Sequence, residues 1–402
     1  MNYLLTGAEF NNKGAEAMTL VALKNIYNFD KSANVFLIDT GFYPSFELKK
    51  NITFLPLPKW NLRKLSGRKP VRFYKSRMKD FIKFFIPSKK SFFGTFFKTK
   101  ETLKKIDVMI DISGFAFSSK WGDEVAIDWL AQIDIMQKNG SKIWIMPQSF
   151  GPFDFESNKV IEYAKNVLKK CECIYAREES GYNLLQNIGL VNIKRASDSV
   201  LIEKDFNPSL LINNFEKCYE DIIVKEKHNI ALIPNIRLID KGGINYSTIL
   251  EFYSNVIKNY GSKFNFYLIA HTGEDLSVCK KIKELFMKSE QVIYIDHVLS
   301  SFNYETFIKK MDFIIASRYH SIIHAYKESI PAVVLGWADK YNSVLNETAQ
   351  LEYLIDLNSS AKALDTVDKM IQSYEIESKK IQENVTKIQK TSCYDFLKEI
   401  NC

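Results

Sequence analysis

The chain has 402 residues, of which 46% are hydrophobic and 25% charged, which is typical of a globular protein with two or three domains. No apolar run reaches the roughly 18 to 20 residues of a membrane-spanning helix. The first residues lack the cationic start and apolar stretch of a signal peptide, so we expect a cytoplasmic protein. The six cysteines lack zinc-site spacing, so we expect reduced thiols and no metal.

Residues 59–105 make the protein basic. They hold sixteen lysines and arginines against two acidic residues, a charge of +14, so the remainder of the chain sums to −6. They also hold ten aromatic residues. This mixture suits an anionic membrane surface, and we expect peripheral contact with the inner face of the cell membrane. A solvated insertion without a partner is the alternative; nucleic acid would use the same chemistry, but no nucleic-acid module is visible elsewhere.

The chain opens with a predicted strand at residues 3–7, a polar loop, and apolar positions at helical spacing over residues 18–26. Within the loop, Gly14 allows a close approach of the backbone to a ligand, and Asn11 and Asn12 can bind sugar hydroxyls. The loop matches neither a dinucleotide nor a nucleoside triphosphate fingerprint. An ordinary strand-to-helix turn is the alternative.

Strands and helices then alternate through the rest of the first half. Strands are predicted at residues 35–38, 52–55, 107–112, 142–147 and 173–176, and helices at about 123–138 and 157–170. Arg177 directly follows the last of these strands, where a ligand-facing rim is expected. An ion pair with Glu178 or Glu179 would also explain it.

After a charged linker at about residues 205–227 the alternation restarts. Strands are predicted at residues 230–234, 264–270, 292–295, 311–316 and 330–335, helices at about 247–260 and 275–288, and a helical tail from about 361. Arg237 follows the first of these strands. We therefore expect an α/β protein with two doubly wound Rossmann-like domains facing a cleft. The expected domains are residues 1–205 and 206–380, with a helix at 381–402 that packs back on the first.

The residues after the strand at 311–316 are the strongest site candidates. Ser317, Arg318 and His320 lie between that strand and a short helix. Open α/β sheets bind ligands at this edge, where helix amino termini favour anions. A cation and an imidazole there could hold a phosphate or carboxylate. Alternatively, Arg318 caps a neighbouring carbonyl and His320 is a core histidine.

Six stretches, in this order, resemble the polysaccharide pyruvyl transferase family. They are residues 11–17 (NNKGAEA), 112–115 (ISGF), 147–152 (PQSFGP), 176–180 (AREES), 197–198 (SD) and 317–325 (SRYHSIIHA), the last carrying the Arg-x-His signature. One position departs from the pattern. Many members have Asn-x-Gly-Asp in the first loop, whereas this chain has Ala15 at the Asp position, with Glu16 beside it.

The two facing Rossmann-like domains expected from the alternation are the arrangement of the GT-B glycosyltransferases. The resemblance implies an enzyme that moves a pyruvyl group from phosphoenolpyruvate to a sugar or lipid-linked oligosaccharide. We expect no cofactor, because arginines can offset the phosphate charge. By similarity, Arg318 and His320 bind the donor and act in catalysis. From their chemistry and their positions after predicted strands, we expect further donor contacts at Ser317, Arg237 and Lys340. On the same grounds we expect acceptor contacts at Asn11, Asn12, Gly14, Glu16 and Arg177. Glu16 or Asp198 could deprotonate a sugar hydroxyl.

Two other functions remain open from the sequence. A GT-B glycosyltransferase that uses a nucleotide sugar would have the same cleft, although no nucleotide fingerprint is visible. A non-catalytic protein that binds glycan or phosphate, or that scaffolds envelope polysaccharide assembly, would also keep these features. The sequence leaves the oligomeric state, the acceptor sugar and the stereochemistry of the ketal open.

Overall fold

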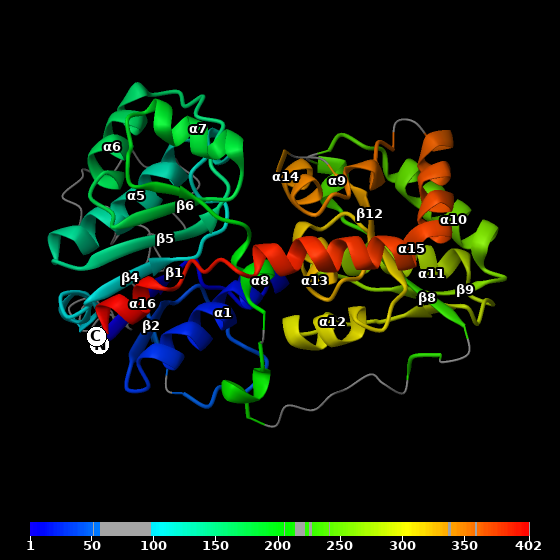
Figure 1. The fold of residues 1–402 in the computed structure, drawn as a ribbon, viewed down its shortest axis with the longest axis horizontal. Helices are drawn as coiled ribbons and strands as arrows, with labels where there is room; N and C mark the ends of the chain where they lie inside the picture. Colours follow the sequence, from blue (N-terminus) through cyan, green and yellow to red (C-terminus); the bar gives the residue numbers. More distant parts are fainter. Residues whose placement is uncertain are drawn as a thin grey trace, which may run out of the picture.

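The structure, a computed structural model, describes residues 1–50, 52–56, 98–204, 206–213, 222–224, 227–240, 242–336, 339–357 and 360–401. Two parallel sheets with flanking helices form two lobes, which confirms the predicted α/β class (Figure 1). Most of the basic segment, from residue 59 to 97, lies outside the described residues, so membrane contact stays a prediction. Among the described residues, no helix combines the length and apolar content needed to cross a bilayer.

The first sheet has seven parallel strands. They are β1 Asn2–Thr6, β2 Asn34–Ile38, β3 Ile52–Leu55, β4 Val108–Asp111, β5 Lys142–Gln148, β6 Cys173–Ala176 and β7 Ile193–Arg195. Their order is β3-β2-β1-β4-β5-β6-β7, so the direction of winding reverses between β1 and β4. Open α/β sheets bind ligands at the carboxyl ends of the strands beside such a reversal.

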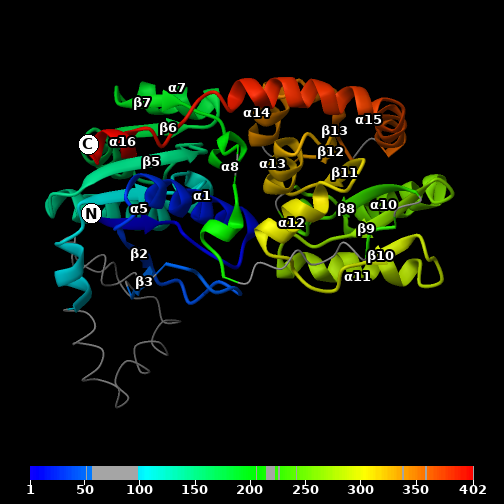
Figure 2. The same ribbon diagram turned by 60° about the horizontal axis from the view of Figure 1, so that its bottom comes forward.

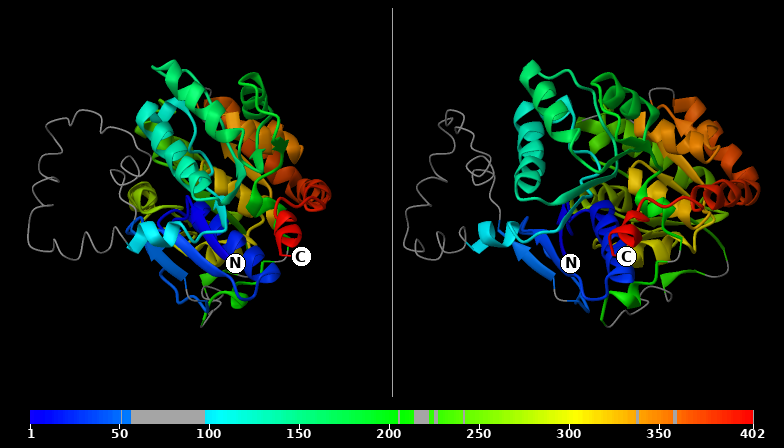
Figure 3. Two further views of the ribbon diagram at one scale, coloured as in Figure 1. Left: turned by 90° about the vertical axis from the view of Figure 1, so that its left-hand side faces the viewer. Right: turned by 60° about the vertical axis from the view of Figure 1, so that its left-hand side comes forward.

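Helices cover both faces of this sheet (Figure 3). They are α1 Lys13–Phe29, α5 Asp123–Lys138, α6 Asn158–Leu168, α7 Glu179–Asn187 and α8 Ser199–Ile202. Alternate residues of a strand face opposite sides. Tyr3 and Leu5 of β1 therefore pack in the core with α1, whereas Leu4 packs in the core with α5 and α6. Parallel strands need this double cover, which explains their continuous apolar runs.

The second sheet repeats the same winding with six parallel strands. They are β8 His228–Ile233, β9 Phe264–Leu268, β10 Val292–Tyr294, β11 Phe313–Ala316, β12 Ala332–Leu335 and β13 Leu354–Ile355, in the order β10-β9-β8-β11-β12-β13. The reversal therefore lies between β8 and β11. Its helices are α9 Arg237–Asp240, α10 Tyr246–Tyr260, α11 Leu276–Leu285, α12 Ser301–Ile308, α13 Tyr319–Lys327, α14 Asp339–Glu347 and α15 Ser360–Ile388.

One apolar core is shared by the two lobes. It joins residues of α1 and α8 from the first lobe to residues of α12 and α13 from the second, together with one face of each sheet. α1 is buried around most of its first ten residues because it lies between its own sheet and these helices. The carboxyl edges of both sheets therefore meet at a packed junction.

The chain returns to the first lobe at its end. After the 29-residue helix α15, the chain crosses to α16 Phe396–Ile400 (Figures 1 and 2). The Phe396 ring stacks on Trp144 of β5 with centroids 4.3 Å apart, and the Asn401 side chain bonds to the Tyr3 hydroxyl. The two ends of the chain therefore lie close together on the first lobe.

Candidate active site at the junction of the two sheets

Arg318 organises the rim of the second sheet. It is the N-cap residue of α13, and its Nε and Nη2 donate to the two carboxylate oxygens of Asp275 at 2.8 and 2.7 Å. Nη2 also donates to the Thr272 hydroxyl. Asp275 is fully buried and accepts the backbone N–H of Ile236, so one carboxylate ties together the loops after β8, β9 and β11. Among the described residues, Nη1 of Arg318 has no hydrogen-bond partner.

Ser317 belongs to the framework of this rim. Its hydroxyl donates to the carbonyl of Ile233, and its own carbonyl accepts from Asn235 at 2.6 Å and from the Tyr341 hydroxyl at 3.0 Å. The side chain is fully buried. Ser317 therefore fixes the strand-to-helix turn that carries Arg318.

The side chain of His320, from the second lobe, contacts the first lobe. Its ring lies against Gly14 on the first turn of α1, so closely that a Cβ on Gly14 would be 2.1 Å from Nδ1. Its Nε2 is buried without a hydrogen bond and lies 3.6 Å from the Asp198 carboxylate. Burial lowers the pKa of His320 to about 3, against the opposing pull of Asp198, so the imidazole is neutral here. Two loops that the sequence predicted as separate binding elements are thus in contact.

Arg177 supplies a buried cation from the first sheet. Nη1 donates to Asp198 at 2.6 Å, and Nη2 donates to the carbonyl of Gly114 and to the Ser149 hydroxyl, both at 2.8 Å. Ser149 in turn donates to Glu178. The Nε of Arg177 is buried without a hydrogen bond. The expected ion pair with Glu178 is present at 3.8 Å, but Asp198 is the closer carboxylate.

The ring of Tyr319 contacts two cations from different parts of the chain. The Arg177 guanidinium lies 4.9 Å and the Lys340 ammonium 5.2 Å from its centroid. Burial, followed by the charges of Arg177 and Arg318, lowers the pKa of Lys340 to about 8. An anion relieves crowding of cations, so Arg177, Arg318 and Lys340, with the neutral imidazole of His320 as a hydrogen-bonding group beside them, are suited to bind one. We call these four residues the basic cluster.

The remaining predicted site residues lie around this cluster in different ways. Asn12 caps α1 by accepting the N–H of Gly14 at 3.0 Å, and Asn11 is exposed beside it. Glu16 is buried, accepts the N–H of Ser301 at 2.5 Å, and lies 3.7 Å from the Lys13 ammonium. The carboxylate that the sequence offered as an acceptor contact is therefore occupied at the lobe junction.

Arg237 faces the surface of the second lobe. Its guanidinium pairs with Asp240 at 2.6 Å and with Glu274 at 2.7 Å, and its side chain is 38% exposed. Two carboxylates already engage it, so the structure does not bring Arg237 into the basic cluster.

Sequence reasoning did not single out Asp275, Tyr319 or Asp111. Asp111, at the end of β4, is fully buried and accepts from the side chains of Thr6, Ser113, Trp129 and Gln148. Burial raises its pKa. It fixes the loops after β1, β4 and β5, from which Gly114 and Ser149 reach Arg177. Asp111 could have been singled out from the sequence, because it is an acidic residue within an apolar predicted strand.

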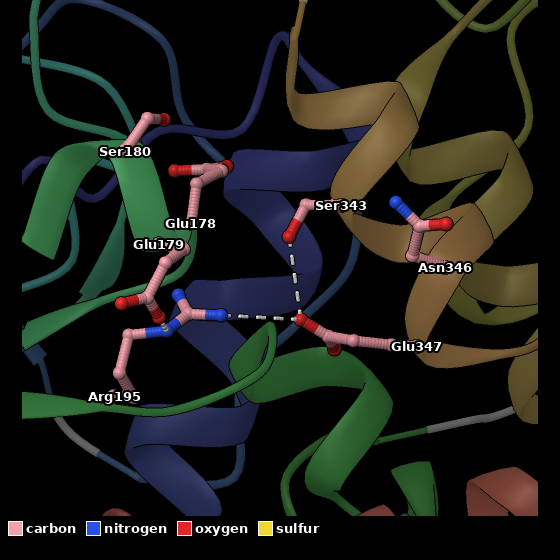
Figure 4. Close-up of a pocket in the computed structure, with 7 residues that line it drawn as sticks. All are labelled: Glu178, Glu179, Ser180, Arg195, Ser343, Asn346 and Glu347. Carbon is pink, nitrogen blue, oxygen red and sulfur yellow. Dashed lines mark hydrogen bonds and ion pairs between the residues drawn. The ribbon is translucent and has the colours of Figure 1, made fainter.

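A cavity of about 300 Å³ opens between α7 of the first lobe and α14 of the second (Figure 4). It is lined by Glu178, Glu179, Ser180, Arg195, Ser343, Asn346 and Glu347. Glu347 accepts from the Ser197 hydroxyl at 2.5 Å and lies 3.7 Å from Arg195. No cluster of side chains able to hold a metal ion occurs in the part of the chain that the structure describes.

Comparison with known proteins identifies the family. The polysaccharide pyruvyl transferase family matches the sequence over residues 12–339, a span that includes Gly14, Arg177, Asp198, His320 and the start of α14. The chain belongs to the polysaccharide pyruvyl transferase family. The resemblance first drawn from six short stretches is confirmed. A sequence search of curated proteins finds no match.

Several solved structures have a similar fold, and the two described here contain UDP or a UDP-sugar. A trehalose-6-phosphate structure from E. coli, bound with UDP-2-fluoro glucose, is 10% identical with a TM-score of 0.54, covering 100% of this chain and 98% of that one. S. aureus MnaA with UDP is 13% identical with a TM-score of 0.55, covering 99% and 94%. At such identities the likeness concerns the fold alone, and it confirms the GT-B-like arrangement predicted from sequence.

Proposed function

We propose that this member of the family transfers the pyruvyl group of phosphoenolpyruvate to two hydroxyls of a sugar in a cell-surface polysaccharide or its lipid-linked precursor, forming a ketal. The observation that carries the proposal is the basic cluster, built from both lobes at the carboxyl edges of two sheets. Phosphoenolpyruvate is a small donor with a phosphate and a carboxylate, so it needs several cations within a short span.

The donor would lie against Lys340 and the buried guanidinium of Arg177, with Nη1 of Arg318 as a third contact. Asp275 holds the other side of Arg318, which fixes the direction of that guanidinium. The amino termini of α1 and α13, which meet at Gly14 and His320, add partial positive charge. Lys340 and Arg318 come from the second lobe, which the sequence analysis proposed as the donor side.

The reaction requires a proton on the methylene carbon of the donor. One sugar hydroxyl then bonds to the adjacent carbon, and a second hydroxyl displaces phosphate; the two hydroxyl protons are accounted for by the new methyl group and the departing phosphate. A bound dianion raises the pKa of a neighbouring imidazole. His320, neutral without donor and 3.6 Å from Asp198, would then carry a proton to the donor while Asp198 stabilises its charged form.

Isothermal titration with phosphoenolpyruvate and with UDP tests the proposal. We expect phosphoenolpyruvate to bind and UDP not to bind. Lys340→Met should weaken donor binding about thirtyfold or more, since a close cation contact to a buried anion contributes about 2 kcal/mol or more. His320→Asn should keep donor binding and lose phosphate release in the presence of acceptor. Binding of UDP alone would instead support a nucleotide-sugar glycosyltransferase. Binding of neither, with an acceptor glycan present, would support a non-catalytic scaffold.

A further inference from the structure

One aromatic ring contacts three members of the basic cluster. Tyr319 is the first residue of α13 and is 7% exposed. The Arg177 guanidinium and the Lys340 ammonium lie over its ring, 4.9 and 5.2 Å from the centroid, and the His320 ring meets it edge to face at 5.3 Å. Arg177 belongs to the first lobe and Lys340 to the second, so this ring joins cations from both lobes.

The two cations differ in how firmly the protein holds them. Arg177 is fixed by hydrogen bonds to Asp198, Gly114 and Ser149. Lys340 has a flexible four-carbon stem and is partly exposed near the start of α14. Such a side chain loses conformational freedom when it binds an anion, and this loss weakens binding. A group that holds Lys340 near Arg177 in advance would therefore strengthen donor binding.

Two perpendicular rings hold the Lys340 ammonium in this way. It lies 5.8 Å from the centroid of Tyr341 as well as 5.2 Å from that of Tyr319, and the planes of the two rings differ by 78°. The negative face of an aromatic ring attracts a cation, more strongly where water is excluded. The Tyr341 hydroxyl donates to the carbonyl of Ser317, so the two rings are tied to the turn that carries Arg318.

The charged groups around Lys340 act in opposite directions. Its ammonium is repelled by the guanidinium groups of Arg177 and Arg318. It is attracted by the carboxylates of Glu178 and Asp198, which also pair with Arg177. A ring face attracts the ammonium without adding another negative charge, which would repel an incoming dianion.

We propose that Tyr319 is a positioning residue of the donor site, and that its ring holds the Lys340 ammonium near the Arg177 guanidinium before the donor arrives. The proposal rests on the donor binding proposed above, because it explains how cations from two lobes are kept at one place. Both cations lie within 5.2 Å of one centroid, so a compact dianion can contact both. The role belongs to the ring and not to the phenolic hydroxyl.

A double-mutant cycle, measured by titration with phosphoenolpyruvate, tests this role. With Lys340 present, Tyr319→Leu should weaken donor binding about three- to tenfold, because the lysine must then be ordered on binding. In the Lys340→Met background the same substitution should change the affinity by less than about twofold, since the side chain to be positioned is gone. Equal weakening in both backgrounds would show a merely structural effect and would overturn the proposal.

Further variants separate the ring face from the space that it fills. Tyr319→Phe keeps the ring and should bind phosphoenolpyruvate with nearly unchanged affinity, whereas Tyr319→Met, which has no ring face, should behave as Tyr319→Leu does. Tyr246→Leu, at a partly exposed position on α10, is the matched control and should leave donor binding unchanged. If Tyr319→Phe binds as weakly as Tyr319→Leu, the ring is not the acting group and the proposal is overturned.

NMR of the protein labelled with ¹³C at the lysine Cε atoms tests the contact whether or not the Tyr319 variants fold. Protons over the face of an aromatic ring are shifted upfield. The signal that disappears in Lys340→Met should therefore lie upfield of the signals of exposed lysines in the unchanged protein. A Lys340 signal at the ordinary lysine position would overturn the contact on which the proposal rests.

Inorganic phosphate, used as a second probe, distinguishes this proposal from the proposed function. If phosphate binds with the same coupling between Tyr319 and Lys340 but phosphoenolpyruvate never binds, the positioning role stands and pyruvyl transfer fails. If phosphoenolpyruvate binds without that coupling, the positioning role fails and the proposed function stands. If neither anion binds, both are overturned.

Discussion

At the scale of single residues, the junction depends on one missing side chain. Gly14 leaves room for the His320 ring from the other lobe, and a Cβ there would be 2.1 Å from Nδ1. This is why a glycine is needed in the first loop, and the reason is the approach of a histidine about three hundred residues later in the chain. Gly14 has no positive φ, so contact and not backbone conformation sets the requirement.

Gly14→Ala should therefore displace His320. We expect a loss of about 1–3 kcal/mol in the free energy of unfolding, as for other overpacked sites, together with a loss of turnover larger than the loss of donor affinity. Thermal unfolding and a phosphate-release assay would measure these. Gly273→Ala is the matched control, because an added Cβ there meets nothing within 4 Å. Equal behaviour of the two variants would contradict the contact between the loops.

The neutral state of His320 predicts a pH dependence of stability. Burial lowers its pKa to about 3, whereas an unfolded histidine titrates near 6.5. Below about pH 6.5 the unfolded chain takes up a proton that the folded chain excludes. The contribution of His320 to the free energy of unfolding is therefore complete above that pH. As the pH drops toward 3, the free energy of unfolding falls by up to about 1.4 kcal/mol per pH unit.

His320→Gln removes this group and should flatten the profile. The difference in thermal midpoint between the unchanged protein and the variant should shrink between about pH 6.5 and about pH 5. His271, whose pKa burial also lowers, is present in both proteins and cancels in the comparison. A difference that stays constant over this range would mean that His320 is charged in the folded protein.

How far the sequence predicted these residues follows from where their partners lie. Arg318 and His320 could be found because a strand, a turn and a helix are local patterns. The partner of Arg318, Asp275, lies 43 positions earlier in a different loop. A single sequence carries no signal for such pairing. It could therefore predict that Arg318 caps a carbonyl or binds the donor, but not that it pairs with the carboxylate of Asp275. The hydrogen bond between Glu16 and the N–H of Ser301 could not be predicted from the sequence for the same reason.

At the scale of elements, the long helices and most apolar strands were predictable, whereas two of the short edge strands, β7 and β13, were not. β7 has three residues, of which only Ile193 is buried, and β13 has two. Neither is long enough to show an apolar period. By contrast, β8, β9 and β11 consist mostly of apolar residues, and their predicted ranges begin within two residues of those in the structure.

One helix end depends on a carboxylate from the other lobe. Glu16 of α1 accepts the N–H of Ser301 at the start of α12, where the helix dipole favours a negative charge. Glu16→Ala should cost about 1–3 kcal/mol, because it leaves this N–H and the Lys13 ammonium buried without their partner. Glu162→Ala, on the exposed face of α6, is the control and should change the thermal midpoint little. Equal thermal midpoints for Glu16→Ala and Glu162→Ala would show that Glu16 does not stabilise the junction of the lobes.

At the scale of the whole molecule, the two sheets have the same winding but do not behave as separate bodies. The α/β alternation predicted two Rossmann-like units. It did not predict that α1, α8, α12 and α13 share one apolar core, because a helix buried on several sides looks like any apolar helix in sequence. A large apolar junction restricts relative motion of domains. The basic cluster, formed by both lobes, is therefore held in place without a ligand.

A shared core also predicts shared unfolding. Phe396→Ala removes the ring stacked on Trp144 of the first lobe and should cost about 3 kcal/mol, as for other buried phenylalanines. Because the core continues through α1 into α12 and α13, we expect amide hydrogen exchange to accelerate by the same factor in β4 and β5 as in β8 and β11. Phe29→Ala, at a 38% exposed position, is the control. Faster exchange confined to the first sheet would show that the lobes open independently, in which case a donor would have to draw the basic cluster together as it binds.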